Sequence, residues 1–285
     1  MGTTSLGTTQ IGDTRFEWGR RTYVMGVINM TPDSFSGDGL GDDVDSALQQ
    51  ALGFQECGAD IIDVGGESTR PPAVYADAAP TSENQELSRV IPVIEALTRD
   101  LAVPVSVDTY KAAVSRAAIK AGASMINDVW GFRRDPDMAG AAAEAGVPVV
   151  LMHNQDHFEY DDLLPDVIGA LRHMRDAAID AGIAVDSIIL DPGMGFGKTA
   201  EHNLEILRRL DEFHVLERPL LVGMSRKSTI GRVLDVPPDE RVEGTAATVA
   251  LSIAGGADIV RVHDVKEMVR VARMSDAIVR GWEPG

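Results

Sequence analysis

The feature that most constrains the fold of this chain is an alternation, repeated eight times, of a short apolar run with a longer segment of helical period. The apolar runs are rich in β-branched residues and almost continuously hydrophobic, as is typical of strands covered on both faces. They predict strands at residues 23–29, 60–66, 104–109, 124–129, 148–153, 187–193, 219–225 and 258–264. Capping signals predict helices between them, among others at residues 43–58, 81–101, 110–122 and 166–182.

Eight strands that are each followed by a helix, with no linker between two halves, predict an α/β fold of the (β/α)8 or TIM-barrel type. An open, doubly wound sheet is the alternative, but the G-x-G-x-x-G fingerprint of dinucleotide-binding sheets is missing after the first strand. Residues 14–23 predict a short N-terminal hairpin that covers the bottom of the barrel. We therefore expect a flexible tail at residues 1–13 and a single barrel domain at residues 14–285.

The charge balance restricts the possible partners. A formal net charge of −18 argues against binding to nucleic acid or to an anionic membrane surface. No stretch approaches the roughly 18 apolar residues of a membrane span, and the first residues lack a signal pattern. Cys57 is the only cysteine, which favours a reducing, cytoplasmic location. Any phosphate site in so acidic a chain must be a local cluster of cations.

Polar side chains end all eight predicted strands. Because the carboxyl ends of barrel strands meet at one mouth, these side chains are expected to converge there. A single strand-terminal Asp often only caps the next helix, and Asp128 and Asp264 fit that structural interpretation. Asp63 and Glu67 could likewise be structural partners of a neighbouring Arg or Lys. Eight strands that deliver polar groups to one end nevertheless favour a functional site.

The residue types at these strand ends suit a flat heterocycle beside an anion. Asp108, Asn127, Asp191 and Lys227 can accept from ring N–H groups and donate to ring oxygen or nitrogen atoms. Apolar contacts to the ring faces could come from Met152 and Phe196. A second set (Arg70, Arg261 and His263, with the Ser228 hydroxyl) indicates a phosphate or diphosphate site.

The sequence predicts a metal site only where a bound diphosphate would supply some of the ligands. Asn29 and a diphosphate oxygen could hold Mg²⁺, which accepts few protein ligands, whereas no His/Cys cluster has zinc spacing. Residues 191–198 look superficially like a phosphate-binding loop, but the glycines before Lys198 have the wrong spacing. We interpret this run as a mobile loop between strand and helix.

These strand-end motifs resemble, one by one, those of the dihydropteroate synthases. The matching runs are 26–36 (Gly-Val-Ile-Asn-Met-Thr-Pro-Asp-Ser-Phe-Ser), 63–71 (Asp-Val-Gly-Gly-Glu-Ser-Thr-Arg-Pro), 106–109, 126–128, 151–153, 190–198 (Leu-Asp-Pro-Gly-Met-Gly-Phe-Gly-Lys), 223–228 (Gly-Met-Ser-Arg-Lys-Ser) and 261–264 (Arg-Val-His-Asp). They span about residues 23–280 in the order expected of the family, and the first two runs are highly specific.

The resemblance implies a transferase of folate biosynthesis. Such an enzyme condenses 6-hydroxymethyl-7,8-dihydropterin diphosphate with p-aminobenzoate, which gives 7,8-dihydropteroate and diphosphate. It also implies Mg²⁺ near Asn29, inhibition by sulfonamides, and a homodimer formed through the helices near the seventh and eighth strands.

The resemblance assigns a role to each matching residue. The pterin would be held by Asp108, Asn127, Met152, Asp191, Gly223 and Lys227, and the diphosphate by Asn29, Arg70, Arg261 and His263. The p-aminobenzoate pocket would comprise Phe35, Thr69, Arg70, Pro71, Phe196, Lys227 and Ser228. Catalytic roles would belong to Asp33, Asp108, Lys227 and Arg261.

Two departures from the family pattern concern the first two loops. Gly37-Asp38-Gly39 stands where the family usually has Asp-Gly-Gly, and Pro72 opens a longer loop where Gly is common. Two alternatives therefore stay open. One is a pterin-binding homologue without catalysis. The other is a methyltetrahydrofolate–corrinoid methyltransferase, which would share the pterin residues but has no use for cations around a diphosphate.

Overall fold

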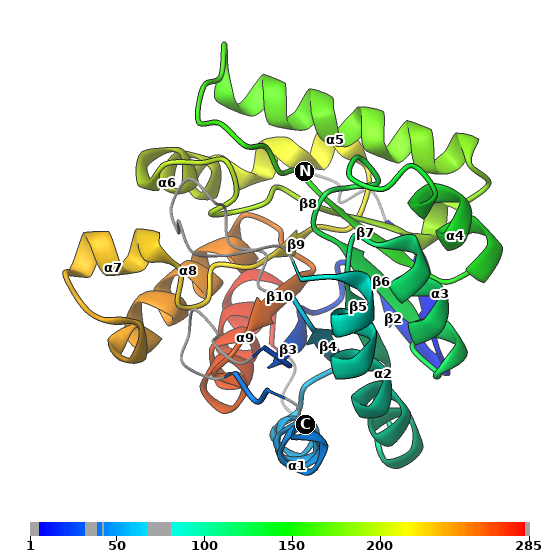
Figure 1. The fold of residues 1–285 in the computed structure, drawn as a ribbon. Helices are drawn as coiled ribbons and strands as arrows, with labels where there is room; N and C mark the ends of the chain where they lie inside the picture. The colour runs from blue at the N-terminus through cyan, green and yellow to red at the C-terminus, as the bar shows by residue number, and fades with distance from the viewer. Residues whose placement is uncertain (1–5, 32–38, 42, 68–80, 283–285) are drawn as a thin grey trace.

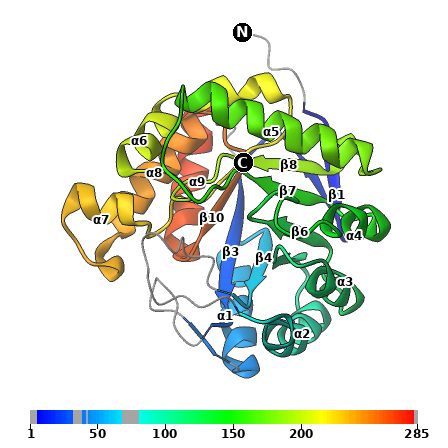
Figure 2. The ribbon, with the colours of Figure 1, turned by 45° about the horizontal axis from the view of Figure 1, so that its top comes forward.

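The computed structural model describes residues 6–31, 39–41, 43–67 and 81–282. Eight parallel strands form one sheet in the order β8-β7-β6-β5-β4-β3-β10-β9. A parallel bridge between Leu190 and Leu220 joins the two outer strands, so the sheet closes into a barrel. The strands form an inner ring surrounded by helices (Figures 1 and 2). The predicted (β/α)8 barrel is therefore confirmed.

All eight predicted barrel strands occur, although most are shorter than predicted. They are β3 (Tyr23–Asn29), β4 (Ile61–Gly65), β5 (Val105–Asp108), β6 (Met125–Asp128), β7 (Val149–Met152), β8 (Ile188–Asp191), β9 (Leu221–Val222) and β10 (Ile259–Val262). The largest difference is at β9, for which we predicted residues 219–225. Its apolar residues continue past the point where ladder hydrogen bonds end, because burial extends beyond the paired segment.

The described helices lie on the outside of the barrel. They are α1 (Val44–Cys57), α2 (Glu83–Asp100), α3 (Ala112–Lys120), α4 (Met138–Ala145), α5 (Leu163–Asp180), α6 (Ala200–Arg208), α7 (Ser228–Leu234), α8 (Val242–Ala254) and α9 (Val265–Val279). Side-chain caps explain the starts of α1, α2 and α6. At α1 the Asp43 side chain accepts from the amide of Ser46, and Gly58 ends the helix with φ of 99°.

The start of α5 differs from the prediction, which placed it at residue 166. The helix begins at Leu163, with Pro165 in its first turn, where proline is tolerated. The Asp166 carboxylate accepts from the amides of Asp161 and Asp162, at 2.8 and 3.1 Å. Asp166 therefore secures the first turn from inside the helix rather than preceding it.

The N-terminal hairpin starts earlier than predicted. It comprises β1 (Thr8–Ile11) and β2 (Thr14–Glu17), which pair antiparallel, so the part of the expected tail after Gly7 is ordered structure. Ile11 and Phe16 are fully buried. Trp18 packs beside them and donates from its indole nitrogen to the Thr9 hydroxyl at 2.8 Å. Only Ile11 of β1 is apolar, so the Gly/Thr-rich start carries no strand pattern that would have predicted β1.

The barrel interior has an apolar layer at the bottom and a polar layer at the top. The bottom layer packs against the hairpin and contains Met25, Ile61, Met125, Val150, Ile189, Leu221 and Ile259. Strand alternation turns the residue two positions later along each strand toward the same interior. Those positions include Asp63, Asn127, Asp191 and Arg261. The sequence thus seals one end of the barrel and places its polar groups at the other.

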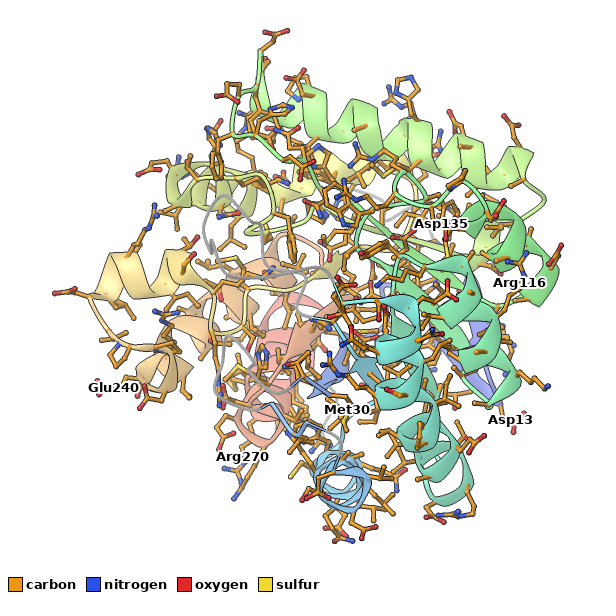
Figure 3. All side chains as sticks on the ribbon, in the orientation of Figure 1. Asp13, Met30, Arg116, Asp135, Glu240 and Arg270 are labelled. Carbon is orange, nitrogen blue, oxygen red and sulfur yellow. The ribbon has the colours of Figure 1, made fainter. Side chains whose placement is uncertain are left out.

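A second, larger core fills the space between the strands and the helices, and it includes Met30, Ile62 and Leu97. Charged side chains such as Arg116, Glu240 and Arg270 lie on the periphery, whereas Met30 is central (Figure 3). Among the residues that the structure describes, no helix is long and apolar enough to span a membrane.

Candidate active site

A pocket of about 410 Å³, open to solvent, lies at the carboxyl ends of the barrel strands. Its wall is formed by strands β5, β6, β7, β8 and β10 and by residues that follow β6, β8, β9 and β10. The lining residues are Asp108, Asn127, Val129, Met152, Asp191, Phe196, Gly223, Ser225, Lys227, Arg261 and His263. This is the position at which barrel enzymes place their active sites.

Arg261 links three strands across the interior of the barrel. From β10 its guanidinium donates to Asp63 on β4 at 2.7 Å and to Asp108 on β5 at 2.8 Å. Asp63 is fully buried and also accepts from the amide nitrogen of Asn127 at 2.9 Å. Because Asp63 contacts both Arg261 and Asn127, it fixes the orientation of these two side chains, which line the pocket.

Burial shifts the pKa values of the carboxyl groups at the mouth upward. Burial raises the pKa of Asp108 to about 7; the Arg261 guanidinium opposes this shift and the Asp63 carboxylate adds to it. Burial also raises the pKa of Asp191, against the influence of the Lys227 ammonium. The Oδ1 atom of Asp108 is buried and has no hydrogen-bond partner within the described part of the chain. An acceptor is therefore available there to a ligand.

Lys227 is a second cation that lines the pocket. Burial lowers its pKa to about 8, and the Asp191 carboxylate limits the shift. Its ammonium donates to the backbone carbonyl of Met194 and lies 4.6 Å from the centre of the Phe196 ring. The loop after β8 is thus joined to the loop after β9 through this lysine.

The loops after β9 and β10 are also joined to each other. The Ser225 hydroxyl lies 2.9 Å from Nδ1 of His263 and accepts from the His263 amide at 3.2 Å. Arg226 forms an ion pair with Asp264, in which its Nε donates at 3.0 Å. These contacts hold His263 at the edge of the pocket, directly after the strand that carries Arg261.

The structure brings most of the predicted site residues together. Asp108, Asn127, Met152, Asp191, Phe196, Gly223, Lys227, Arg261 and His263 all line the pocket. Asn29, at the end of β3, and Ser228, at the start of α7, do not belong to that lining, and both are half-buried. The remaining predicted residues (Asp33, Phe35, Thr69, Arg70 and Pro71) lie outside the described residues, as do the departures at residues 37, 38 and 72.

The structural interpretations made from the sequence have mixed outcomes. The Asp128 carboxylate accepts from the amides of Trp130 and Phe132, both at 2.8 Å, so it holds the turn after β6 and does not cap α4, which begins at Met138. Glu67 pairs with Lys111, which also reaches Glu86. Asp264 precedes α9 but makes no side-chain cap and binds Arg226 instead, so its capping role was predicted wrongly.

Asp63 and Ser225 position pocket residues, and neither contribution was predicted from the sequence. Asp63 was considered only as a structural ion-pair partner, yet it holds both Arg261 and Asn127. The signal was a charged residue in the middle of a buried strand, two positions from the glycine at the strand end. The sequence carries no comparable signal for Ser225, because serine is common in the loops that follow strands.

The described residues do not form a cage for a metal ion. Among them, no group of three or more His, Cys, Asp or Glu side chains could hold one. Asn29 offers one hard, neutral oxygen at the end of a strand beside β10, which carries Arg261. That donor fits Mg²⁺, since this ion keeps several waters and binds phosphate oxygens in preference to protein cages.

Fold and site together define a barrel enzyme that binds a flat, polar heterocycle next to an anionic group. The family model for the pterin binding enzyme matches residues 25–263. The dihydropteroate synthase of Bacillus subtilis is 54% identical over 259 residues, which are 91% of this chain and 89% of that protein.

Solved structures give the same result. The structure of dihydropteroate synthase from Clostridium difficile, in the presence of pteroic acid, is 49% identical in sequence with a TM-score of 0.87. The match covers 93% of this chain and 99% of that one. The structure of the Yersinia pestis enzyme with a sulfonamide drug is 43% identical with a TM-score of 0.90, and the match covers 96% of this chain and 100% of that one. This chain therefore belongs to the pterin-binding enzymes, in the branch formed by the dihydropteroate synthases.

Proposed function

We propose that this chain, a transferase of folate biosynthesis, joins 6-hydroxymethyl-7,8-dihydropterin diphosphate to p-aminobenzoate at the pocket described above. The observation that carries the proposal is a pocket lined by two carboxyl groups, an amide and a lysine, with the guanidinium of Arg261 beside them. The first set matches the donors and acceptors of a pterin ring, and the arginine suits the leaving diphosphate.

The pterin subsite consists of Asp108, Asn127, Asp191 and Lys227, with Met152 and Gly223 against the ring faces. Asp108 offers its unpartnered Oδ1 and Asp191 its carboxylate to ring N–H and amino groups. Asn127 donates to Asp63, which leaves its amide oxygen for the ligand. Lys227 supplies a donor to ring oxygen or nitrogen.

The diphosphate subsite consists of Arg261 and His263, with Asn29 and Arg70. Departure of the diphosphate leaves a cationic pterin, which the carboxylates of Asp108 and Asp191 stabilise until the amine of p-aminobenzoate attacks. Arg261 holds the released anion. Mg²⁺, bound by Asn29 together with diphosphate oxygens and water, would neutralise charge on the leaving group.

The p-aminobenzoate subsite is the part of the pocket beside Phe196 and Lys227, with Ser228 at the start of α7. Phe196 offers a ring face and Lys227 a cation within 4.6 Å of its centre, a pairing that suits an aromatic carboxylate. Phe35, Thr69, Arg70 and Pro71 complete this subsite, and Asp33 assists catalysis. The same subsite accepts sulfonamides.

The test is diphosphate release from pterin diphosphate and Mg²⁺, with and without p-aminobenzoate, in the wild type and in Asp108→Ala and Arg261→Ala. Dihydropteroate should form only with both substrates, and its rate should fall at least about a hundredfold in each variant, as expected for one lost transition-state contact. Pterin binding without turnover would instead indicate a silent homologue. Methyl transfer from methyltetrahydrofolate would indicate the corrinoid-dependent alternative.

A homodimer and a cytoplasmic location complete the proposal. Helices α7, α8 and α9, next to β9 and β10, expose the apolar side chains Val233, Leu234, Leu251, Met274 and Ile278. Exposed apolar residues concentrated on neighbouring elements are typical of a subunit interface. Cys57 is unpaired, in keeping with a reducing compartment. The chain is proposed to act as one domain, with the hairpin as part of it.

A further inference from the structure

Lys198 is a lysine whose side chain is almost completely buried. Its side chain comes from the end of the loop that follows β8, and it is 4% exposed. The ammonium lies 2.8 Å from Nδ1 of His153, and it donates to the carbonyls of Gly193 at 3.1 Å and Phe196 at 3.0 Å. A longer contact of 3.5 Å reaches the carbonyl of His153. The described contacts thus give every N–H of the ammonium an acceptor.

The chemistry of this cluster requires a neutral His153. Because the ammonium has only donors, Nδ1 of His153 must accept, and its proton is then on Nε2. Burial and the neighbouring Lys198 both lower the pKa of His153, in agreement with that assignment. Burial lowers the pKa of Lys198 well below its usual value, against the attraction of Asp191, so the ammonium form is costly unless it is fully hydrogen-bonded. The buried ammonium of Lys198 therefore restricts the backbone conformations of residues 193–197, whose carbonyl groups accept its hydrogen bonds.

The loop backbone leaves little freedom at the point where Lys198 holds it. Gly193 has φ of 72°, and a Cβ atom there would lie 1.7 Å from the carbonyl oxygen of His153. The amide of Gly193 donates to Asp191 at 2.7 Å, and the amide of Gly195 to the Asn203 side chain at 2.8 Å. The loop is therefore pressed against the end of β7 and fixed at successive peptide groups.

Two lysines hold this loop from opposite sides. Lys227 contacts the carbonyl of Met194 from the pocket, and Lys198 contacts the carbonyls of Gly193 and Phe196 from the interior. Tyr160 adds a hydrogen bond of 2.7 Å to the carbonyl of Gly197. The residue presented between these anchors is Phe196, whose ring lines the pocket.

We propose that Lys198, with His153, is a positioning residue for the second substrate: it fixes the backbone of residues 193–197 so that the Phe196 ring forms the wall against p-aminobenzoate. The proposal rests on the proposed function, which places p-aminobenzoate beside Phe196. Lys198 does not line the pocket itself. The pterin subsite depends less on it, because Asp108 and Asn127 come from β5 and β6, whereas this loop follows β8.

The test compares Lys198→Met, Tyr160→Phe and the wild type in steady-state turnover, varying each substrate in turn. Lys198→Met should raise KM for p-aminobenzoate about tenfold, which is ~1.4 kcal/mol, and Tyr160→Phe should raise it less. KM for the pterin diphosphate and kcat at saturation should change by less than about threefold, because those contacts remain. Isothermal titration of sulfamethoxazole into enzyme with pterin and diphosphate gives the same comparison without turnover.

A matched control is Asp276→Asn, which removes the charge from part-buried hydrogen bonds to Thr22 at the opposite end of the barrel and should leave both KM values unchanged. An equal loss for both substrates, or unchanged KM for p-aminobenzoate in Lys198→Met and Tyr160→Phe, would overturn the proposal. Tyr160→Phe keeps the test valid if Lys198→Met does not fold. Failure of the wild type to make dihydropteroate would count against the proposed function, whereas the positioning role is judged from the variants.

Discussion

The guanidinium of Arg261 donates to the carboxylate of Asp108 at 2.8 Å, from the last strand of the barrel to the third along the chain. The same guanidinium binds Asp63 at 2.7 Å. Burial alone would lower the pKa of Arg261, but the two acids hold it above its usual value. The diphosphate subsite and the pterin subsite therefore share one charged network, and a change in either should alter the other.

The first prediction concerns the pH profile of kcat/KM for the pterin diphosphate. In the proposed pterin subsite Asp108 acts as a carboxylate, and its pKa is raised to about 7, so that form predominates only above about pH 7. Lys227 acts there as an ammonium, and its pKa is lowered to about 8, so that form predominates only below about pH 8. The profile should be bell-shaped with a narrow maximum between these values. In Lys227→Arg, the alkaline limb should disappear; its persistence would assign that limb to another group.

The second prediction is that Asp63→Asn changes the acid limb although Asp63 does not line the pocket. The Asp63 carboxylate raises the pKa of Asp108 by repulsion, and Arg261 lowers it. Without the charge on Asp63, the acid limb should move to lower pH. KM for the pterin diphosphate should rise about tenfold, as when a buried partner of a functional group is lost. Asp60→Asn, just before β4 at the other end of the barrel, is the control; an unmoved acid limb in Asp63→Asn would contradict the coupling.

The third prediction is that sulfamethoxazole inhibits turnover competitively with p-aminobenzoate. The p-aminobenzoate subsite contains a ring face and a cation, Phe196 and Lys227, that suit an arylsulfonamide equally well. Inhibition should be overcome by p-aminobenzoate and not by the pterin diphosphate. Noncompetitive inhibition would mean that the changed residues of the first two loops give the drug a different position.

The fourth prediction separates stability from catalysis. Phe16 is fully buried where the hairpin closes the barrel bottom, and its ring packs 4.6 Å from that of Tyr23. Phe16→Ala should lower the free energy of unfolding by about 3–5 kcal/mol, measured by urea denaturation. Both KM values and kcat at 25 °C should stay as in the wild type, because the pocket lies at the other end. A fall in kcat with unchanged stability would refute this separation.

The barrel could be predicted because its pattern is local and repeated. Buried parallel strands are continuously apolar, and helix caps such as Asp43 and Gly58 act within a few residues of their helix end. The hairpin boundary was missed because Thr8–Ile11 becomes a strand only through its contacts. Thr9 bonds Asp186, far along the chain, and Ile11 enters the barrel core. Such tertiary contacts leave no local pattern in the sequence.

The pocket lining could largely be predicted because strand ends in a barrel converge by geometry. The arrangement of its charges could not. That Arg261 binds Asp63 as well as Asp108 depends on the stagger between β10, β4 and β5, which strand alternation does not specify. The environment of Lys198 was equally inaccessible, because the spacing of Gly193 to Lys198 indicates a loop without showing that its lysine turns inward.

The anchoring of residues 193–197 through peptide groups has a consequence for how this pocket can vary in evolution. Lys198, Asn203 and Tyr160 bind backbone atoms, and none of these hydrogen bonds involves the side chain of Phe196. Exchange of that one ring therefore leaves the loop scaffold intact. Under the proposed function, single substitutions at position 196 should change the selectivity among flat aromatic ligands while the barrel stays folded.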